Sequence, residues 1–145
     1  MMHDHLPRSK VLAASAARAV TAGTNMTAVT IPPSASKAVI LLDITASATD
    51  AGDTLDVYID VSPDHGTTYI NAVHFTQQAG NGSAAKEYAV LEATNPGTSV
   101  VTATSDASSG AVRPGMWGTH MRLRYVIADA NADASHTFSA KVFLS

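Results

Sequence analysis

Five aspartates lie close together in one short segment, and carboxylate oxygens are the ligands that calcium prefers in proteins. They are Asp43, Asp50, Asp53, Asp56 and Asp60. Their spacing does not reproduce the EF-hand loop, in which ligands alternate along twelve residues and a glutamate closes the site. We therefore expect these aspartates to be solvated strand and turn residues, and the sequence predicts no metal site.

The histidines offer two further arrangements for a metal. His3 and His5 flank Asp4, and His120 and His136 lie on predicted strands that could be neighbours. Neither arrangement forms an HExxH motif or another set with the spacing of known zinc ligands. With no cysteine in the chain, thiolate-ligated zinc and iron–sulfur sites are excluded, and no cofactor is expected.

Catalytic chemistry has few candidates. The chain has many serines but no G-x-S-x-G motif, and its only glutamates are Glu87 and Glu92. Asp56 and Asp60 share one face of a predicted strand, about 13 Å apart at the rise of a strand. Glycosidase carboxylates lie roughly 5 to 9.5 Å apart, so this pair is too widely spaced. We expect a protein that is not an enzyme.

Aromatic and charged residues are better candidates for contacts with a partner. Trp117 lies in a glycine-rich loop and, with Tyr58 and Tyr69, could anchor a protein partner or stack on a sugar. Arg122 and Arg124 alternate along a predicted strand and could face Asp56 and Asp60, either within the chain or at a subunit contact. Ordinary packing and solvated faces are the alternatives for all of these residues.

Composition limits the number of domains, the size of the core and the classes of partner. The chain has 145 residues, a net charge of −3 and 14% charged residues, and alanine, threonine and serine make up 56 positions against 30 for valine, isoleucine, leucine and phenylalanine. So few large apolar residues suit one domain with a thin core between two sheets. The scattered basic residues disfavour nucleic acid as a partner, and no apolar run is long enough to span a membrane. Arg18 interrupts the alanine-rich start, so a cleaved signal peptide is not predicted.

Alternation of apolar and polar residues predicts about eight strands. The clearest are residues 37–47, 54–62, 69–76, 121–128 and 135–144. Residues 86–94 and 98–105 are predicted to pair as a hairpin, and residues 48–53 are predicted to be a hairpin loop. For residues 11–21 we expect an extended or edge strand, with helix as the alternative because alanine favours it. The fold class is therefore all-β, an antiparallel β-sandwich or jelly roll of residues 11–145 behind an extended N-terminal arm of residues 1–10.

Three segments carry a resemblance to a known class of proteins. They read AVILLDITAS, DTLDVYIDVSPDHGTTYINAVHFT and MRLRYVIADANADASHTFSAKVFL, and they begin at residues 38, 53 and 121. Their succession, with the SPDHGTT turn, resembles small virion structural proteins of tailed bacteriophages, of the capsid decoration (cement) or minor head kind. The likeness covers about 60 residues.

The resemblance implies a sandwich, made in the host cytoplasm, that binds the outer surface of the capsid. It would bridge subunits of the major capsid protein, as a dimer or trimer of its own chain, without contact with nucleic acid or membrane. The extended arm could span about 33 Å and reach a neighbouring subunit. The residues expected to contact partners are His3, His5, Leu6, Arg8, Trp117, Arg122 and Arg124. A tail, baseplate or fibre module and a carbohydrate-binding adhesion domain are the alternatives.

Overall fold

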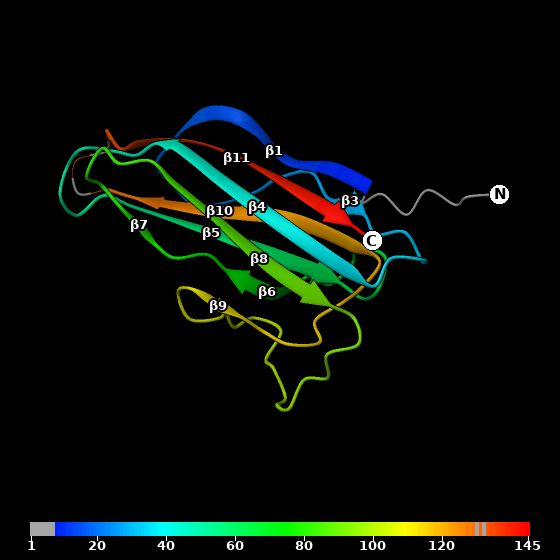
Figure 1. Cartoon of the computed structure of the whole chain (residues 1–145). Helices are drawn as coiled ribbons and strands as arrows, with labels where there is room; N and C mark the ends of the chain where they lie inside the picture. The colour runs from blue at the N-terminus through cyan, green and yellow to red at the C-terminus, as the bar shows by residue number, and fades with distance from the viewer. Residues whose placement is uncertain (1–7, 130, 132) are drawn as a thin grey trace.

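The computed structural model describes residues 8–129, 131 and 133–145, and these form two antiparallel sheets packed face to face (Figure 1). Eight strands make up most of the sandwich: β1 (Arg8–Ala19), β2 (Thr21–Asn25), β4 (Lys37–Ala46), β5 (Thr54–Ser62), β6 (Ile70–His74), β8 (Ala85–Glu92), β10 (His120–Ala128) and β11 (Ser135–Leu144). Three strands have two residues each: β3 (Val29–Thr30), β7 (Gln78–Ala79) and β9 (Ala111–Val112). Among the described residues, no helix is long and apolar enough to cross a membrane.

The strand order is that of a jelly roll. Sheet A has the order β1-β11-β4-β8, and sheet B has the order β2-β10-β5-β6-β9. The antiparallel pairs are nested along the chain: β5 pairs with β6, β4 with β8, β2 with β10 and β1 with β11. The chain is thus one long hairpin that has been rolled up, with its tip between β5 and β6. The predicted all-β antiparallel sandwich is confirmed.

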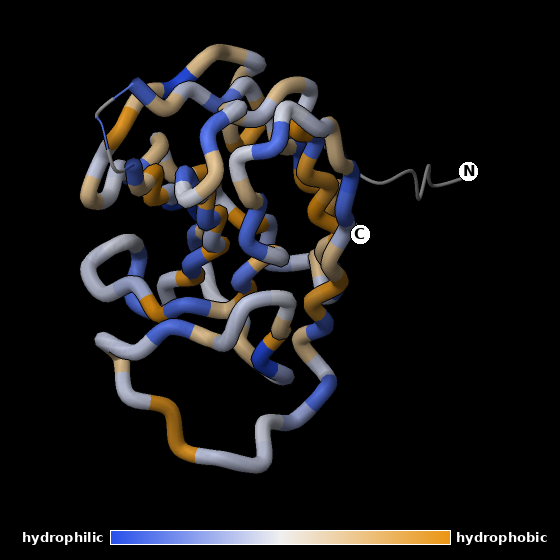
Figure 2. Tube along the Cα trace, turned by 90° about the vertical axis from the view of Figure 1, so that its left-hand side faces the viewer, coloured by the Kyte–Doolittle hydropathy of each residue, from blue (hydrophilic) through white to orange (hydrophobic). Residues whose placement is uncertain are grey.

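The core lies between the sheets and follows the predicted alternation. On β10, Met121, Leu123 and Ile127 are at most 1% exposed, and on β11 the same holds for Phe138, Ala140, Val142 and Leu144. Figure 2 shows hydrophobic and hydrophilic residues following one another along much of the chain. Because side chains alternate between the two faces of a strand, each sheet presents one apolar face to the other.

The alanine-rich start of the chain is a strand, as predicted, and Arg18 explains part of its shape. β1 pairs with β11, and its register shifts between Val11 and Ala16. The guanidinium of Arg18 donates hydrogen bonds to the carbonyl oxygens of Ala16 and Phe138, at 2.9 and 2.6 Å, and lies 4.1 Å from the Phe138 ring centroid. Burial lowers the pKa of Arg18. This side chain therefore satisfies carbonyl groups where the strand is irregular.

The arm predicted at residues 1–10 overlaps this strand. Arg8, Ser9 and Lys10 are part of β1 and lie opposite Leu144, Phe143 and Val142. Residues 1–7 lie outside the described residues.

Two predicted hairpins are wrong because the strands concerned do not pair with their neighbours in the sequence. Residues 48–53 connect β4 in sheet A to β5 in sheet B, so they link the two sheets instead of closing a hairpin. Residues 98–105 form no strand, because β8 takes β4 as its partner instead. Turn-forming residues mark where the chain reverses, but they do not tell which sheet the next strand joins.

The tip of the rolled hairpin is a hydrogen-bonded turn at residues 62–68. The Ser62 hydroxyl donates to Asp64 Oδ1 at 2.8 Å, and the amides of Gly66 and Thr68 donate to Ser62 Oγ and Asp64 Oδ1 at 2.8 and 2.7 Å. Hydrogen bonds from Thr68 and Ser62 lower the pKa of Asp64 to about 2. His65 and Gly66 adopt positive φ of 60° and 89°. The SPDHG segment therefore forms the predicted turn.

Candidate functional site

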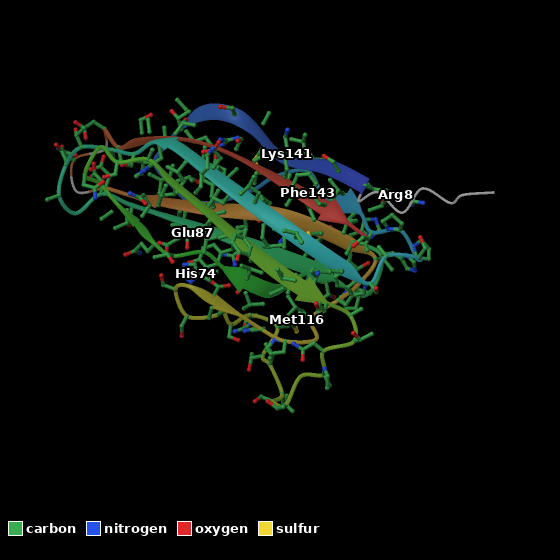
Figure 3. All side chains as sticks on the ribbon, in the orientation of Figure 1. Arg8, His74, Glu87, Met116, Lys141 and Phe143 are labelled. Carbon is green, nitrogen blue, oxygen red and sulfur yellow. The ribbon has the colours of Figure 1, made fainter. Side chains whose placement is uncertain are left out.

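The residues expected to contact partners fall into separate places. His3, His5 and Leu6 lie outside the described residues. Arg8 is exposed at the start of β1, on the edge of sheet A, and is labelled in Figure 3. Trp117 is half-buried and packs against the core, whereas Arg122 and Arg124 lie on the outer face of sheet B with side chains 22% and 21% exposed.

Arg122 and Arg124 converge on one aspartate. Asp60 is directly opposite Arg122 in the ladder and is 3% exposed. Arg124 Nε lies 3.1 Å from Asp60 Oδ2, and Arg122 Nε lies 3.5 Å from the same oxygen. The predicted pairing of these arginines is thus found for Asp60 within the chain, while Asp56 takes His74 as its partner, with Nε2 2.7 Å from Oδ1.

The tyrosines of sheet B are also engaged inside the chain. The guanidinium of Arg122 lies 3.8 Å from the ring centroid of Tyr69, and that of Arg124 lies 4.1 Å from that of Tyr58. Tyr58 is 9% exposed and stacks on His74 at 4.2 Å on its other side. The Tyr58 ring is thus covered on both faces and offers no free platform for a sugar.

A long segment, residues 93–119, lies over this polar face. Asp106 pairs with Arg124 at 2.5 Å, the Ala107 amide donates to Asn71 Oδ1 at 2.8 Å, and the Ala107 carbonyl lies 2.9 Å from His74 Nδ1. These contacts leave a polar pocket of about 300 Å³ beside Asp60 and Tyr69. Around Asp60 and Asn71, the outer face of sheet B is therefore covered by the chain itself.

The outer face of sheet A is apolar and uncovered. The ladder places Val11, Lys141, Leu41 and Tyr88 in one row and Ser9, Phe143, Val39 and Val90 in the next. Tyr88 is 74% exposed and Val11 54%, and the other four apolar residues are half-buried. Figure 1 shows β4 and β8 in front of the other strands, and Figure 3 labels Lys141 and Phe143 on β11. We call Val11, Val39, Leu41, Tyr88, Val90 and Phe143 the apolar face. Val39 and Leu41 lie on the outer side of β4, which has no cover among the described residues.

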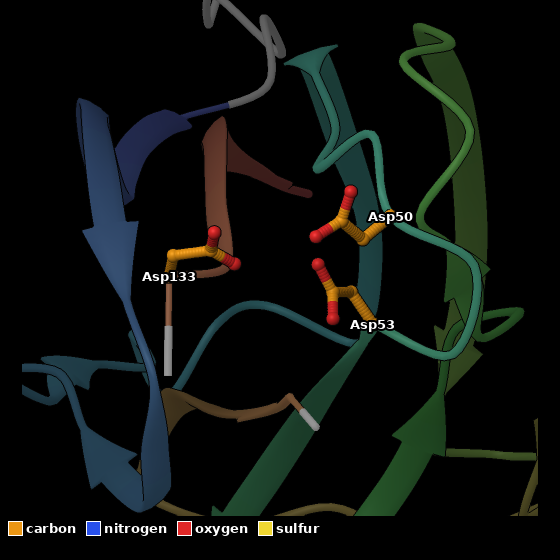
Figure 4. Close-up of side chains that lie close together, drawn as sticks. All are labelled: Asp50, Asp53 and Asp133. Carbon is orange, nitrogen blue, oxygen red and sulfur yellow. The ribbon is translucent and has the colours of Figure 1, made fainter. Parts of the chain in front are cut away.

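The histidines and aspartates considered as metal ligands in the sequence mostly lie apart from one another. His120 and His136 lie on strands of different sheets, and His136 is 0% exposed. Asp43 lies 3.9 Å from Lys86, and Asp56 and Asp60 have the partners described above. Two of the five aspartates, Asp50 and Asp53, lie close to Asp133, which is far from them in the sequence (Figure 4).

Asp53 is the buried member of this acidic group. Its burial, together with Asp129 and then Asp50 and Asp133, raises the pKa of Asp53. Burial also acts to raise the pKa of Asp129. Hydrogen bonds from the amides of Asn131 and Ala134 outweigh burial, so the pKa of Asp129 is lowered. The group lies where the β4–β5 and β10–β11 connections approach each other.

Comparison with known proteins gives a likeness of fold and nothing closer. No protein-family pattern and no curated protein matches the sequence. A chain in the structure of the infectious bursal disease virus Gx strain matches 97% of this chain with a TM-score of 0.55 and 14% identity. A chain of the VP2 subviral particle of infectious bursal disease virus matches 94%, with a TM-score of 0.50 and 12% identity.

The two viral chains are much longer than this one, which covers 32% and 31% of them. At such low identity the likeness establishes the fold alone. This chain has the jelly-roll architecture of part of a viral particle protein.

Proposed function

We propose that this chain is a non-enzymatic structural protein of a bacteriophage virion. In this proposal it binds the outside of the capsid and bridges subunits of the major capsid protein. The single observation that carries the proposal is the jelly-roll likeness to chains of a viral particle over almost the whole length of this chain. The resemblance of its strand and turn segments to phage decoration proteins supports the finer assignment.

The apolar face is the surface that we assign to the partner. Its six residues come from four adjacent strands of one sheet, and Lys141 lies between Val11 and Leu41 in the ladder. Patches of this kind on a soluble protein commonly mark protein contacts. Asp106 and Ala107 already contact part of the polar face of sheet B, so we assign the partner to the apolar face.

Many modest contacts of this kind would suit a protein that stabilises an assembled shell. A protein that binds the assembled lattice better than free subunits shifts the equilibrium toward the intact shell. Repeated binding sites on the lattice add to this effect when one oligomer can occupy several of them. We expect the chain to act as a dimer or trimer for this reason.

The test is sedimentation of the purified protein alone and mixed with assembled, undecorated phage capsids. The proposal expects stoichiometric co-sedimentation with the capsids, and the sedimentation of the free protein gives its oligomeric state. Absence of co-sedimentation would overturn the decoration role, and binding to tails instead would assign the chain to a tail or baseplate.

A variant of the apolar face tests the assigned surface. A buried tyrosine removes about 150 to 250 Å² from water, and Tyr88 is 74% exposed, so roughly 150 Å² remains for a partner to cover. At ~25 cal/mol per Å², less about 1 kcal/mol for ordering the side chain, Tyr88→Ala should weaken binding by roughly 2 to 3 kcal/mol, or about 30- to 150-fold.

Val100→Ala is the matched control, because Val100 is fully exposed (101%) but lies on the segment between β8 and β10, outside the apolar face. Equal binding by both variants would remove the apolar face from the proposal. Deleting residues 1–7, which leaves β1 intact, separately tests whether His3, His5 and Leu6 contribute.

A further inference from the structure

Three carboxylates from distant parts of the chain meet at one end of the sandwich. Asp50 and Asp53 belong to the connection between β4 and β5, and Asp133 precedes β11. Each offers an oxygen, and these oxygens all lie within 4.8 Å of one another. Figure 4 shows the carboxylates of Asp50 and Asp53 directed toward each other, with Asp133 facing them from the other connection.

The buried member of this group, Asp53, faces a fourth carboxyl, that of Asp129, and has one oxygen without a partner. Asp53 is 2% exposed, and among the described residues its Oδ1 accepts no hydrogen bond. No lysine or arginine within the described residues forms an ion pair with any of the three aspartates. Like charges this close repel, and a buried carboxylate oxygen without a hydrogen bond is unfavourable. A positive charge between them would remove both penalties.

The backbone holds Asp50 and Asp53 in place. The Asp53 amide donates to the Asp50 carbonyl at 3.2 Å, and the Gly80 amide donates to the Asp53 carbonyl at 2.7 Å. Gly80 packs so closely that a Cβ atom there would come within 2.3 Å of the Asp50 carbonyl oxygen. The two aspartates are therefore positioned before any ion arrives, and ordering them on binding costs little.

The pocket beside these aspartates has room for an ion. Its volume is about 230 Å³, and Ser47 and Ser135 line it together with the three carboxylates. Asn131 donates from its side chain to Asp50 Oδ2 at 3.1 Å and fixes that carboxylate from the side. Oxygen donors alone suit hard divalent cations. The irregular arrangement and the space for water suit Ca²⁺, which accepts six to eight oxygens, better than Mg²⁺, which demands near-octahedral geometry.

We propose that Asp50, Asp53 and Asp133 form a calcium site that ties the β4–β5 connection to the segment before β11. These two connections belong to strands of both sheets, so the bound ion would clamp one end of the sandwich. An ion that binds only the folded chain stabilises it by mass action. At a calcium concentration one hundred times the dissociation constant, the ratio of folded to unfolded chain rises about 100-fold.

The test is thermal unfolding of the full chain in EDTA, in CaCl₂ and in MgCl₂, with equilibrium dialysis against ⁴⁵Ca²⁺ for stoichiometry. The proposal expects Ca²⁺ to raise the melting temperature by several degrees, a smaller effect of Mg²⁺, and one calcium ion per chain. Asp133→Asn and Asp53→Asn should each abolish the response. Asp43→Asn, which neutralises a half-buried aspartate on β4 outside this group, is the matched control and should keep the response.

Behaviour in EDTA gives a second readout that does not depend on calcium. Asp53→Asn removes one of the repelling charges, so this variant should melt at or above the temperature of the unsubstituted chain when no ion is present. No calcium response of the unsubstituted chain up to 10 mM CaCl₂, or an equal response in Asp133→Asn and Asp43→Asn, would overturn the proposal.

Discussion

Neutralising Asp60 should destabilise the sandwich far more than neutralising an exposed aspartate. Asp60→Asn keeps the shape of the side chain but removes the charge that faces Arg122 and Arg124, and it sets an amide NH₂ group against their N–H donors. Arg124 retains Asp106, whereas Arg122 retains only the Tyr69 ring.

The contacts set the expected size of the effect. Breaking a buried ion pair costs about 3 to 5 kcal/mol, and each hydrogen bond to a charged group contributes about 1.5 to 3 kcal/mol. Because the two arginine side chains are 22% and 21% exposed, water recovers part of this loss. We expect Asp60→Asn to lower the free energy of unfolding by about 3 kcal/mol, which corresponds to a fall in the melting temperature of roughly 10 °C.

Urea unfolding measures this loss, with the fluorescence of the single tryptophan, half-buried Trp117, as the probe. A double-mutant cycle with Arg122→Gln isolates the pair, and we expect a coupling of about 1 to 2 kcal/mol. Asp43→Asn is the control, because half-buried Asp43 lies 3.9 Å from exposed Lys86, and it should cost less than about 0.5 kcal/mol. A loss for Asp60→Asn as small as that of the control, or zero coupling to Arg122, would refute the reasoning.

Three further substitutions test other parts of the fold. Arg18→Lys keeps the charge but loses the planar donors to the Ala16 and Phe138 carbonyls, and should lower the free energy of unfolding by about 2 kcal/mol in urea titration. Burial lowers the pKa of His136, so below about pH 6.5 the unfolded state binds more protons than the folded state. The free energy of unfolding should therefore fall from pH 7 to pH 5, and it should fall less steeply in His136→Asn. Thermal melts across this pH range measure the difference. Gly118→Ala places a Cβ atom within 2.0 Å of the Ser62 carbonyl oxygen and should cost at least about 2 kcal/mol, and an unchanged urea midpoint would contradict this packing argument.

Local pattern was enough to predict most of the strands. β5, β10 and β11 alternate apolar and polar residues along their length, and each lies within one residue of its predicted range. The alanine-rich β1 was also correctly predicted, although alanine favours helix. Its pairing with β11 and the buried Arg18 outweigh that preference.

Long-range pairing limited what the sequence could predict. Val100 and Val101 favour strand by type, but β8 pairs with β4, and Val100 is fully exposed. The meeting of Asp133 with Asp50 and Asp53 depends on two connections about 80 residues apart along the chain. Local spacing in the sequence does not predict contacts of this kind. The ion pairs of Asp60 could be predicted, because they follow from the alternation of side chains on two neighbouring strands.

The nested pairing of the strands also has a consequence for the order of events in folding. Among the described residues, β1 pairs on sheet A with β11 alone, so this edge of the sheet cannot form until β11 has been synthesised. The turn between β5 and β6 closes the shortest loop of the nested pairs, so pairing has its lowest entropic cost there and can proceed outward. Domains dominated by such distant contacts fold in milliseconds to seconds, and their unpaired edges are exposed meanwhile. We therefore expect slow folding of this chain, in which β1 docks last.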